Sequence, residues 1–287
     1  MVDIIHGATG AQGSPVLSAL TAAGRTAIAA VRHPEAVPDG IAARQVDLAS
    51  ADSLASAYEG ADGVFVHLPM GAPETAAAQA RAVVEAVTRA RPGRVVISTS
   101  GQIVDRPDSP LQATADSPIM TLIDGVTGSG IPTAVVAPRL YLENLLLPVV
   151  LAPAHQEGVL RYPLPASFPV SWSSHLDVAD VVARLLMNTS VSGTVAVGHR
   201  PGLTGVDLAA AFSNHLGREV HFEAITPEAF GGLITPLFGP AAAPVVELYR
   251  ALNAQDGCII AEDSSAQELL GLRPRPIEQW LKDLAVS

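Results

Sequence analysis

The chain has 287 residues, of which 48% are hydrophobic, so it can bury a sizeable core in one large domain or two small ones. Its formal net charge of −11 at pH 7 excludes nucleic-acid binding through bulk electrostatics. The single cysteine, Cys258, excludes an internal disulfide and a cysteine-based metal cluster.

We expect a cytoplasmic protein that is not embedded in a membrane. The first residues lack the charged, apolar and small-residue regions of a signal peptide. The apolar stretch Leu145–Ala154 is shorter than the roughly 20 residues that span a bilayer. Of the 17 basic residues 16 are arginines, and Lys282 is the only lysine, which argues against any mechanism based on a buried active-site lysine.

The first 140 residues alternate short apolar β-rich runs with longer stretches of helical periodicity, a pattern typical of a parallel sheet covered by helices on both faces. The expected strands are Asp3–His6, Thr26–Val31, Ala43–Val46, Gly63–Leu68, Arg94–Ser98 and Thr133–Ala137. The expected helices are Gln12–Ala23, Ser53–Tyr58, Thr75–Ala90 and Pro118–Thr127. The sequence therefore predicts an α/β fold with a Rossmann-type, doubly wound parallel sheet.

The pattern becomes irregular after Pro138, where five prolines between residues 148 and 169 predict a long apolar loop region over the carboxyl edge of the sheet. The elements expected beyond it are a helix at Asp177–Met187, a strand at Thr194–Val197, a helix after Thr204 or Asp207, a strand at Glu219–Ala224 and two or three C-terminal helices. We expect one domain over residues 1–150 and a smaller α+β lobe over residues 151–287. The two are interleaved, because the helix near 176–188 is expected to return to the sheet.

The strongest motif is the glycine-rich segment 7–13, which lies between the first expected strand and the first expected helix. Gly7 allows a tight turn, Gly10 lets the backbone approach a pyrophosphate, and Gly13 permits close packing of helix and strand. The motif predicts a dinucleotide-binding turn, and the alternative is a glycine-rich turn without a ligand. The residues assigned to this turn are Gly7, Thr9, Gly10, Ala11, Gln12 and Gly13.

The residues that follow the second expected strand indicate which dinucleotide is bound. An acidic residue there would accept hydrogen bonds from an adenosine ribose, whereas Arg32 can pair bidentately with a 2′-phosphate. We therefore expect NADPH, with NADH possible but weaker; an exposed arginine without a ligand is the alternative. Further cofactor contacts are expected from His33, from Asp47 and Leu48 at the adenine, from His67, Leu68 and Pro69 at the nicotinamide ribose, and from Ser98.

Five segments together resemble the NmrA-like group of atypical short-chain dehydrogenase/reductases, which includes NADPH-dependent quinone reductases and redox-sensing regulators. They are residues 7–13, 31–34, 98–100, 138–144 and 175–180, and the resemblance covers nearly the whole chain. It implies that Pro138, Arg139 and Tyr141 lie near the reacting nicotinamide. It also implies two possible functions, an NADPH-dependent carbonyl or quinone reductase, or a non-catalytic protein that reports the NADP(H) redox state to a protein partner.

The chain departs from this family at the residues that deliver the proton. Standard members use a Tyr-x-x-x-Lys pair, whose ammonium lowers the pKa of the phenol, but none of the four tyrosines here is followed by a lysine four positions later. Many atypical members keep a lysine on the helix before the sixth strand, where this chain has Thr121–Gly125. We therefore expect a quinone or a hydroxylated, polyketide-like aromatic ketone as substrate. The oxyanion formed from such a substrate is stabilised by delocalisation or by its own hydroxyl group.

Three residues are the candidates for catalysis. Ser100 could hydrogen-bond the substrate carbonyl or cap a turn, and Tyr141 could donate its phenolic proton or form a wall of the pocket. His175 could titrate near neutrality or belong to the hydrogen-bond network of a helix start.

The expected partners are limited to a small aromatic or quinone substrate, bound by a monomer or a homodimer. The histidines lack the spacing of metal ligands, so no metal site is expected. The segments Leu145–Val170 and Phe230–Phe238 would line and cover the substrate cleft, and ordinary core or an oligomer interface is the alternative.

Overall fold

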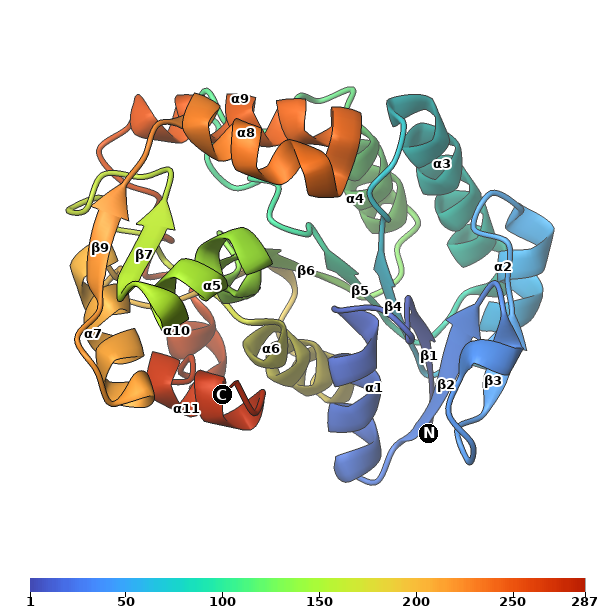
Figure 1. The fold of residues 1–287 in the computed structure, drawn as a ribbon. Coiled ribbons are helices and arrows are strands. Elements are labelled where there is room, and N and C mark those ends of the chain that lie inside the picture. Colours follow the sequence, from blue (N-terminus) through green and yellow to red (C-terminus); the bar gives the residue numbers. More distant parts are fainter. Residues whose placement is uncertain (287) are drawn as a thin grey trace.

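The computed structural model describes residues 1–286, and within them the strands form two parallel sheets (Figure 1). The strands of the main sheet are β1 (Val2–His6), β2 (Thr26–Val31), β3 (Ala43–Gln45), β4 (Gly63–His67), β5 (Val95–Ser98), β6 (Thr133–Pro138) and β8 (Gly193–Val197). Their order across the sheet is β3-β2-β1-β4-β5-β6-β8. The second sheet pairs β7 (Val159–Tyr162) with β9 (His221–Ala224). The predicted doubly wound parallel sheet is confirmed.

Helices cover both faces of the main sheet. The α-helices are α1 (Gly13–Ala22), α2 (Ala51–Tyr58), α3 (Pro73–Ala90), α4 (Pro118–Gly128), α5 (Pro148–Gln156), α6 (His175–Met187), α7 (Gly205–Leu216), α8 (Pro227–Phe238), α9 (Ala242–Asn253), α10 (Ala266–Leu270) and α11 (Ile277–Asp283). Three short 3-10 turns are η1 (Pro34–Ala36), η2 (Leu142–Leu146) and η3 (Gly239–Ala241). Helices α2, α3 and α4 pack side by side on one face, and α1 and α6 pack together on the other (Figure 1).

The central strands are apolar over most of their length because both of their faces are covered. In β4, β5 and β6 the side chains of Val64, Phe65, Val96 and Val136 are fully buried. A parallel sheet between two helical layers requires this continuous hydrophobicity, which also made these strands recognisable in the sequence.

The order of the strands fixes where a ligand can bind. The chain runs from β1 outward to β2 and β3, and then returns to place β4 on the other side of β1. In open α/β sheets, ligands bind beyond the carboxyl ends of the strands at such a reversal. The glycine-rich turn follows β1 and His67 ends β4, so both lie at this position.

The segment from residue 142 to 162 is more regular than the sequence suggests. The prolines predict a long loop, but the structure has η2, α5 and β7 there, so this prediction was wrong. Pro148 occupies the first position of α5, where no intrahelical partner for an N–H group exists. Pro153 lies inside the helix, and the burial of Val150 and Ala154 in the core of the second lobe favours the helix in spite of it.

The C-terminal region holds four α-helices within residues 1–286, where two or three were expected. Helices α8 and α9 pack against each other at the top of the view in Figure 1. In sequence they form one apolar stretch, which is divided at Gly239 by a left-handed backbone angle φ of 55°. Helix α6 begins at His175 and not at Asp177, because Ser174 is its N-cap and forms a capping box with Asp177.

Within residues 1–286, one segment, Pro227–Asn253, is long and apolar enough to cross a membrane by length and composition, and 22% of its most apolar 18-residue stretch is buried. Our expectation on membranes considered only the stretch Leu145–Ala154. In the fold, Pro227–Asn253 forms two 12-residue helices, α8 and α9, packed against each other. Each helix is about 18 Å long, shorter than the roughly 30 Å apolar layer of a bilayer.

Candidate active site

The glycine-rich turn has the shape that a bound pyrophosphate requires. Gly7 adopts a left-handed backbone angle φ of 62°, and the backbone N–H of Gly10 donates to the carbonyl of Gly7 over 2.8 Å. A side chain at Gly13 would overlap the carbonyl groups of His6 and Gly7, so α1 can pack this closely only with glycine there. The first turn of α1 carries no acidic residue, which leaves its positive end available to an anion. These residues fit a dinucleotide.

Gln12 joins this turn to the ends of two other strands. Its side-chain nitrogen donates to Ser100 Oγ over 3.0 Å. Its side-chain oxygen accepts a hydrogen bond from Ser98 Oγ over 2.9 Å and another from the Tyr141 hydroxyl over 3.3 Å. Gln12 is the N-cap residue of α1, but its side chain is bound to the strand ends and leaves the helix terminus open.

The backbone after β5 is held in an uncommon conformation. Ser100 has a left-handed φ of 54°, which a residue with a side chain seldom adopts, and Gly101 follows with a φ of 90°. A side chain at Gly101 would lie 3.3 Å from the carbonyl oxygen of Arg139. This tight double bend turns the chain beside the segment after β6, and Ser100 is left facing Gln12.

A cavity of about 760 Å³ lies at the carboxyl ends of β4, β5 and β6 and extends under α8 and α9. Its polar lining residues are Gln12, His67, Ser100, Gln102, Arg139, Tyr141, Asn144, His175 and Tyr249. Its apolar lining residues include Leu68, Pro69, Met70, Ile103, Leu111, Leu147, Phe230, Ile234, Phe238, Val245, Leu248, Leu252 and Cys258. Polar groups at the carboxyl edge of the main sheet therefore share the cavity with an apolar wall to which α8 and α9 contribute Phe230, Ile234, Phe238, Val245, Leu248 and Leu252.

The structure brings the three catalytic candidates together in this cavity. The predicted residues that line it are Ala11, Gln12, His67, Leu68, Pro69, Ser100, Arg139, Tyr141 and His175. Ser98 is fully buried and supports Gln12, and Pro138 is buried as the last residue of β6. Of the expected segment Leu145–Val170, only Leu147 lines the cavity. The expected segment Phe230–Phe238 contributes Phe230, Ile234 and Phe238 to the lining.

The residues expected at the adenosine lie outside the cavity, after β2 and β3. Arg32 is exposed, and His33 bonds Glu35 over 3.0 Å. The exposed carboxylate of Asp47 accepts the backbone N–H of Ala49 over 2.9 Å. Leu48 packs partly against the core formed by α2, α3 and β4.

Arg139 lines the cavity, but its charge is already paired. Its guanidinium donates from Nη2 to both carboxylate oxygens of Asp105, over 2.8 and 2.9 Å, and the side chain is 1% exposed. It therefore contributes a neutral ion pair to the wall of the cavity.

Burial sets the protonation states of the titratable groups in the cavity. It lowers the pKa of His175 to about 4, with a further contribution from His67, and it lowers the pKa of His67 as well. Burial raises the pKa of Tyr141. At neutral pH both imidazoles are therefore uncharged, and the phenol keeps its proton.

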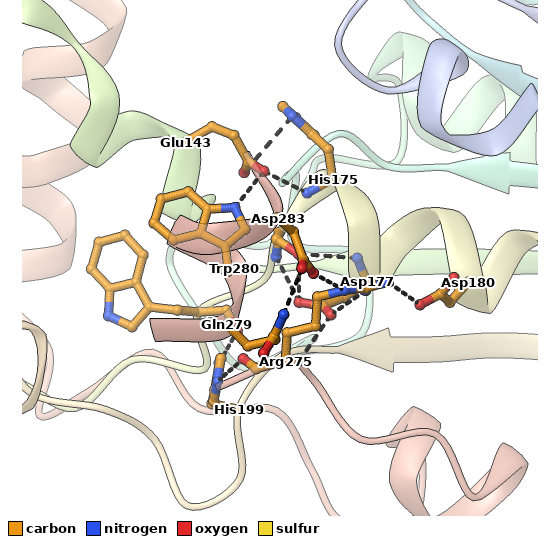
Figure 2. Close-up of polar contacts among 11 residues, drawn as sticks. Glu143, His175, Asp177, Asp180, His199, Arg275, Gln279, Trp280 and Asp283 are labelled. Atoms are coloured by element: carbon orange, nitrogen blue, oxygen red, sulfur yellow. Dashed lines mark hydrogen bonds and ion pairs between the residues drawn. The ribbon is translucent and has the colours of Figure 1, made fainter. Parts of the chain in front are cut away.

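Behind His175 lies a half-buried carboxylate, Glu143, that the sequence did not indicate. Glu143 Oε1 accepts the backbone N–H of His175 over 2.9 Å and the indole N–H of Trp280 over 3.2 Å (Figure 2). Burial raises the pKa of Glu143. Glu143 stands in the segment 138–144 that carries the family resemblance, but no sequence pattern pairs it with a residue 137 positions away.

Next to Glu143 and Trp280, Arg275 connects the C-terminal segment to α6 through ion pairs. It contacts Asp177 over 3.0 Å, Asp180 over 2.8 Å and Asp283 over 3.2 Å (Figure 2). These ion pairs hold the chain that leads into α11, and thereby Trp280, next to Glu143. Within residues 1–286 there is no group of three or more His, Cys, Asp or Glu side chains that could hold a metal ion.

Comparison with protein families and curated proteins gives two matches that cover most of the chain. The model of the NmrA-like family matches residues 3–281. An NAD(P)H azoreductase from Xenophilus azovorans is 30% identical over 230 residues, which represent 78% of this chain and 77% of that protein.

Two solved structures share the fold over almost their entire length. The triphenylmethane reductase of Citrobacter sp., complexed with NADP(H), has a TM-score of 0.79 at 21% identity and covers 98% of this chain and 99% of its own. The NADPH-dependent quinone oxidoreductase of Escherichia coli, complexed with NADPH, has a TM-score of 0.78 at 21% identity, with coverage of 99% and 100%. At these identities the likeness shows the fold.

Proposed function

Because this chain belongs to the NmrA-like family, we propose that it is an NADPH-dependent oxidoreductase that reduces a quinone or a hydroxylated aromatic ketone. Its relatives named above include an NAD(P)H azoreductase, and the two similar structures contain NADP(H) or NADPH. The observation that carries the proposal is the cavity, which connects the dinucleotide-binding turn to an apolar wall large enough for an aromatic molecule.

The residues that would hold NADPH form a path across the carboxyl edge of the sheet. The turn 7–13 would bind the pyrophosphate, Arg32 the 2′-phosphate, and His67 the nicotinamide ribose. The imidazole Nε2 of His67 is buried and has no hydrogen-bond partner among the described residues, so it can bond a polar group of the cofactor. Bound NADPH supplies a hydride.

The substrate would lie between the strand ends and helices α8 and α9. Phe230, Ile234 and Phe238 would pack against its rings, while Ser100 and Tyr141 would hydrogen-bond the carbonyl oxygen. Gln12 donates to Ser100 Oγ, so the Ser100 hydroxyl keeps its own hydrogen for the substrate. The Tyr141 hydroxyl donates to Gln12 and would have to turn away from it to reach the carbonyl oxygen. A quinone or an ortho-hydroxylated ketone suits this environment, because its reduced oxygen anion is delocalised or receives an internal hydrogen bond.

The decisive experiment measures NADPH oxidation against a panel of quinones and hydroxylated aromatic ketones, with unsubstituted aliphatic ketones as controls. We expect turnover with several of the aromatic acceptors and little with the aliphatic ketones. Tight NADPH binding without turnover across a broad panel would contradict the reductase and favour a non-catalytic sensor of NADP(H). Turnover with NADH equal to that with NADPH would contradict the cofactor assignment.

A further inference from the structure

We propose that Glu143 is a positioning residue that orients His175 and renews its proton, so that His175 donates the proton to the substrate oxygen in this lysine-poor chain. This inference deepens the proposed reductase function and rests on it. It assigns a role to a carboxylate that lies behind the cavity wall and that the hydride step does not use.

Glu143 is clamped through one of its two oxygens. Oε1 accepts the backbone N–H of His175, the first residue of α6, and the indole N–H of Trp280, which is fully buried in α11 (Figure 2). Two donors from separate elements therefore fix the carboxyl group in place.

The clamp leaves the other oxygen beside the imidazole. Glu143 Oε2 is buried, has no hydrogen-bond partner within residues 1–286, and lies 3.7 Å from His175 Nδ1. A buried polar atom without a partner is rare and costly, so its retention here points to a function. A separation of 3.7 Å is too long for a hydrogen bond, but catalytic contacts commonly shorten when substrate binds.

His175 connects this carboxyl group to the cavity. Its side chain lines the cavity, and its ring packs on the ring of Tyr141 with centroids 4.4 Å apart. With Nδ1 next to Glu143, the other ring nitrogen, Nε2, remains for the substrate. The imidazole is therefore placed between the reacting molecule and the half-buried carboxyl group of Glu143.

The charged and titratable groups around this pair come from several elements. His67 at the end of β4 and Tyr141 before η2 lie on the cavity side. Asp177 of α6 lies on the inner side and raises the pKa of Glu143 in addition to burial. The carboxylate of Asp177 is itself bound to Ser174 and Arg275.

The proton movements balance without a further reactant. In a ketone the carbonyl carbon would gain the hydride supplied by NADPH, in a quinone the conjugated ring system would gain it, and in both a carbonyl oxygen gains the proton of His175 Nε2. The carboxyl proton of Glu143 moves to His175 Nδ1, which leaves the ring neutral as its other tautomer and Glu143 as a carboxylate. Solvent returns the proton after product release. The step starts from a protonated Glu143 carboxyl group, and burial, which raises the pKa of Glu143, makes this form more accessible than it is in water.

Glu143→Gln tests the assignment, since the amide retains an oxygen for the two clamping donors but has no acidic proton. We expect kcat with a quinone to fall about 100-fold and KM to change less than threefold. The solvent isotope effect on kcat should increase, and NADPH affinity should stay the same. His175→Asn should lower kcat by at least as much, and Glu59→Gln, an exposed residue at the end of α2, should have no effect.

A second measurement needs no turnover. Nitrogen-15 NMR of the histidine rings in the cofactor-free protein should show the His175 ring with its proton on Nε2, because a protonated Glu143 donates to Nδ1. Glu143→Gln should keep this tautomer, since its amide N–H can donate to Nδ1 in the same way, and Glu59→Gln should keep it as well. If Glu143→Gln keeps the wild-type kcat, or if the wild-type ring carries its proton on Nδ1, the inference is overturned. If wild-type protein reduces none of the panel but its His175 ring carries the proton on Nε2, the proposed function fails while the pairing of Glu143 with His175 stands.

Trp280→Phe covers the case in which Glu143→Gln does not fold. It removes a single donor to Oε1 and should lower kcat about 10-fold with KM unchanged, provided that circular dichroism shows a folded protein. An unchanged kcat in a folded Trp280→Phe protein would contradict the positioning role.

Discussion

Tyr141 donates a hydrogen bond to the side-chain oxygen of Gln12 over 3.3 Å, which joins the segment after β6 to the first turn of α1. The same oxygen accepts a hydrogen bond from Ser98. One amide therefore couples the dinucleotide-binding turn to two of the strand ends that line the cavity. A displacement of the turn will therefore shift the side chains of the residues that line the cavity.

Replacing Tyr141 by Phe tests whether the phenol delivers the proton. Burial raises the pKa of this phenol, and Gln12 already accepts its hydrogen, so we expect kcat/KM for a quinone to fall only about 2- to 10-fold, the effect of one hydrogen bond. Steady-state kinetics of Tyr141→Phe and His175→Asn, measured side by side, compare the two losses of kcat/KM. A complete loss in Tyr141→Phe with normal NADPH affinity would identify the phenol as the proton donor.

Arg32→Ala should separate the two nicotinamide cofactors. The exposed guanidinium is placed after β2, where a 2′-phosphate would lie, so NADPH affinity should fall about 10- to 100-fold while NADH affinity stays nearly constant. Fluorescence titration with each cofactor measures both values. Arg81→Ala, which removes another exposed arginine from α3, is the matched control. An equal loss for NADH and NADPH in Arg32→Ala would refute the contact with the 2′-phosphate.

Gly13→Ala should destabilise the fold at the turn. The added methyl group would overlap the carbonyls of His6 and Gly7, and relieving such an overlap costs about 1–3 kcal/mol. Gly232→Ala in α8 is the control, because nothing lies within 4 Å of the added atom and the helix should gain about 0.5–1 kcal/mol. Urea unfolding compares the two variants. Equal stabilities would show that the turn can open to accept a side chain.

The buried imidazole of His6 should make the protein sensitive to mild acid. Burial lowers its pKa to about 3, with a further contribution from His67, whereas an unfolded histidine titrates near 6.5. Its stabilising contribution is complete above pH 6.5 and is lost as the pH falls toward 3, because the unfolded chain binds the proton more readily.

This contribution amounts to about 2 kcal/mol between pH 7 and pH 5. The free energy of unfolding should therefore fall less over this interval in His6→Asn than in the wild type, as measured by urea unfolding at both pH values. His221→Asn, at an exposed position in β9, is the control and should follow the wild type. A wild-type dependence in His6→Asn would show that His6 is not the responsible group.

The main sheet could be predicted from sequence because its information is local. Strands β1, β2, β4, β5 and β6 are largely apolar runs with a glycine or proline close to their ends, and the glycine spacing of the turn marks the binding edge. The apolar region around α5 was misjudged because the burial of Val150 and Ala154 decides its structure, and burial depends on distant elements.

The same reasoning applies to the site. Ser100, Tyr141 and His175 follow strands or begin a helix at the carboxyl edge, so their meeting in one cavity could be expected. The contact of Glu143 with Trp280 depends on how α11 packs, and Arg275 fixes that packing through three carboxylates. No spacing in the sequence reports such a contact.

The placement of β8 and α6 has a consequence for how the chain can be cut. Both elements follow residue 150, yet β8 pairs with β6 and α6 packs on α1. A fragment of residues 1–150 would have β6 as an open edge with unpaired peptide groups, and the apolar side of α1 would be uncovered. Such a fragment should aggregate. The first half of the chain therefore needs β8 and α6 from the second half to fold into a soluble protein.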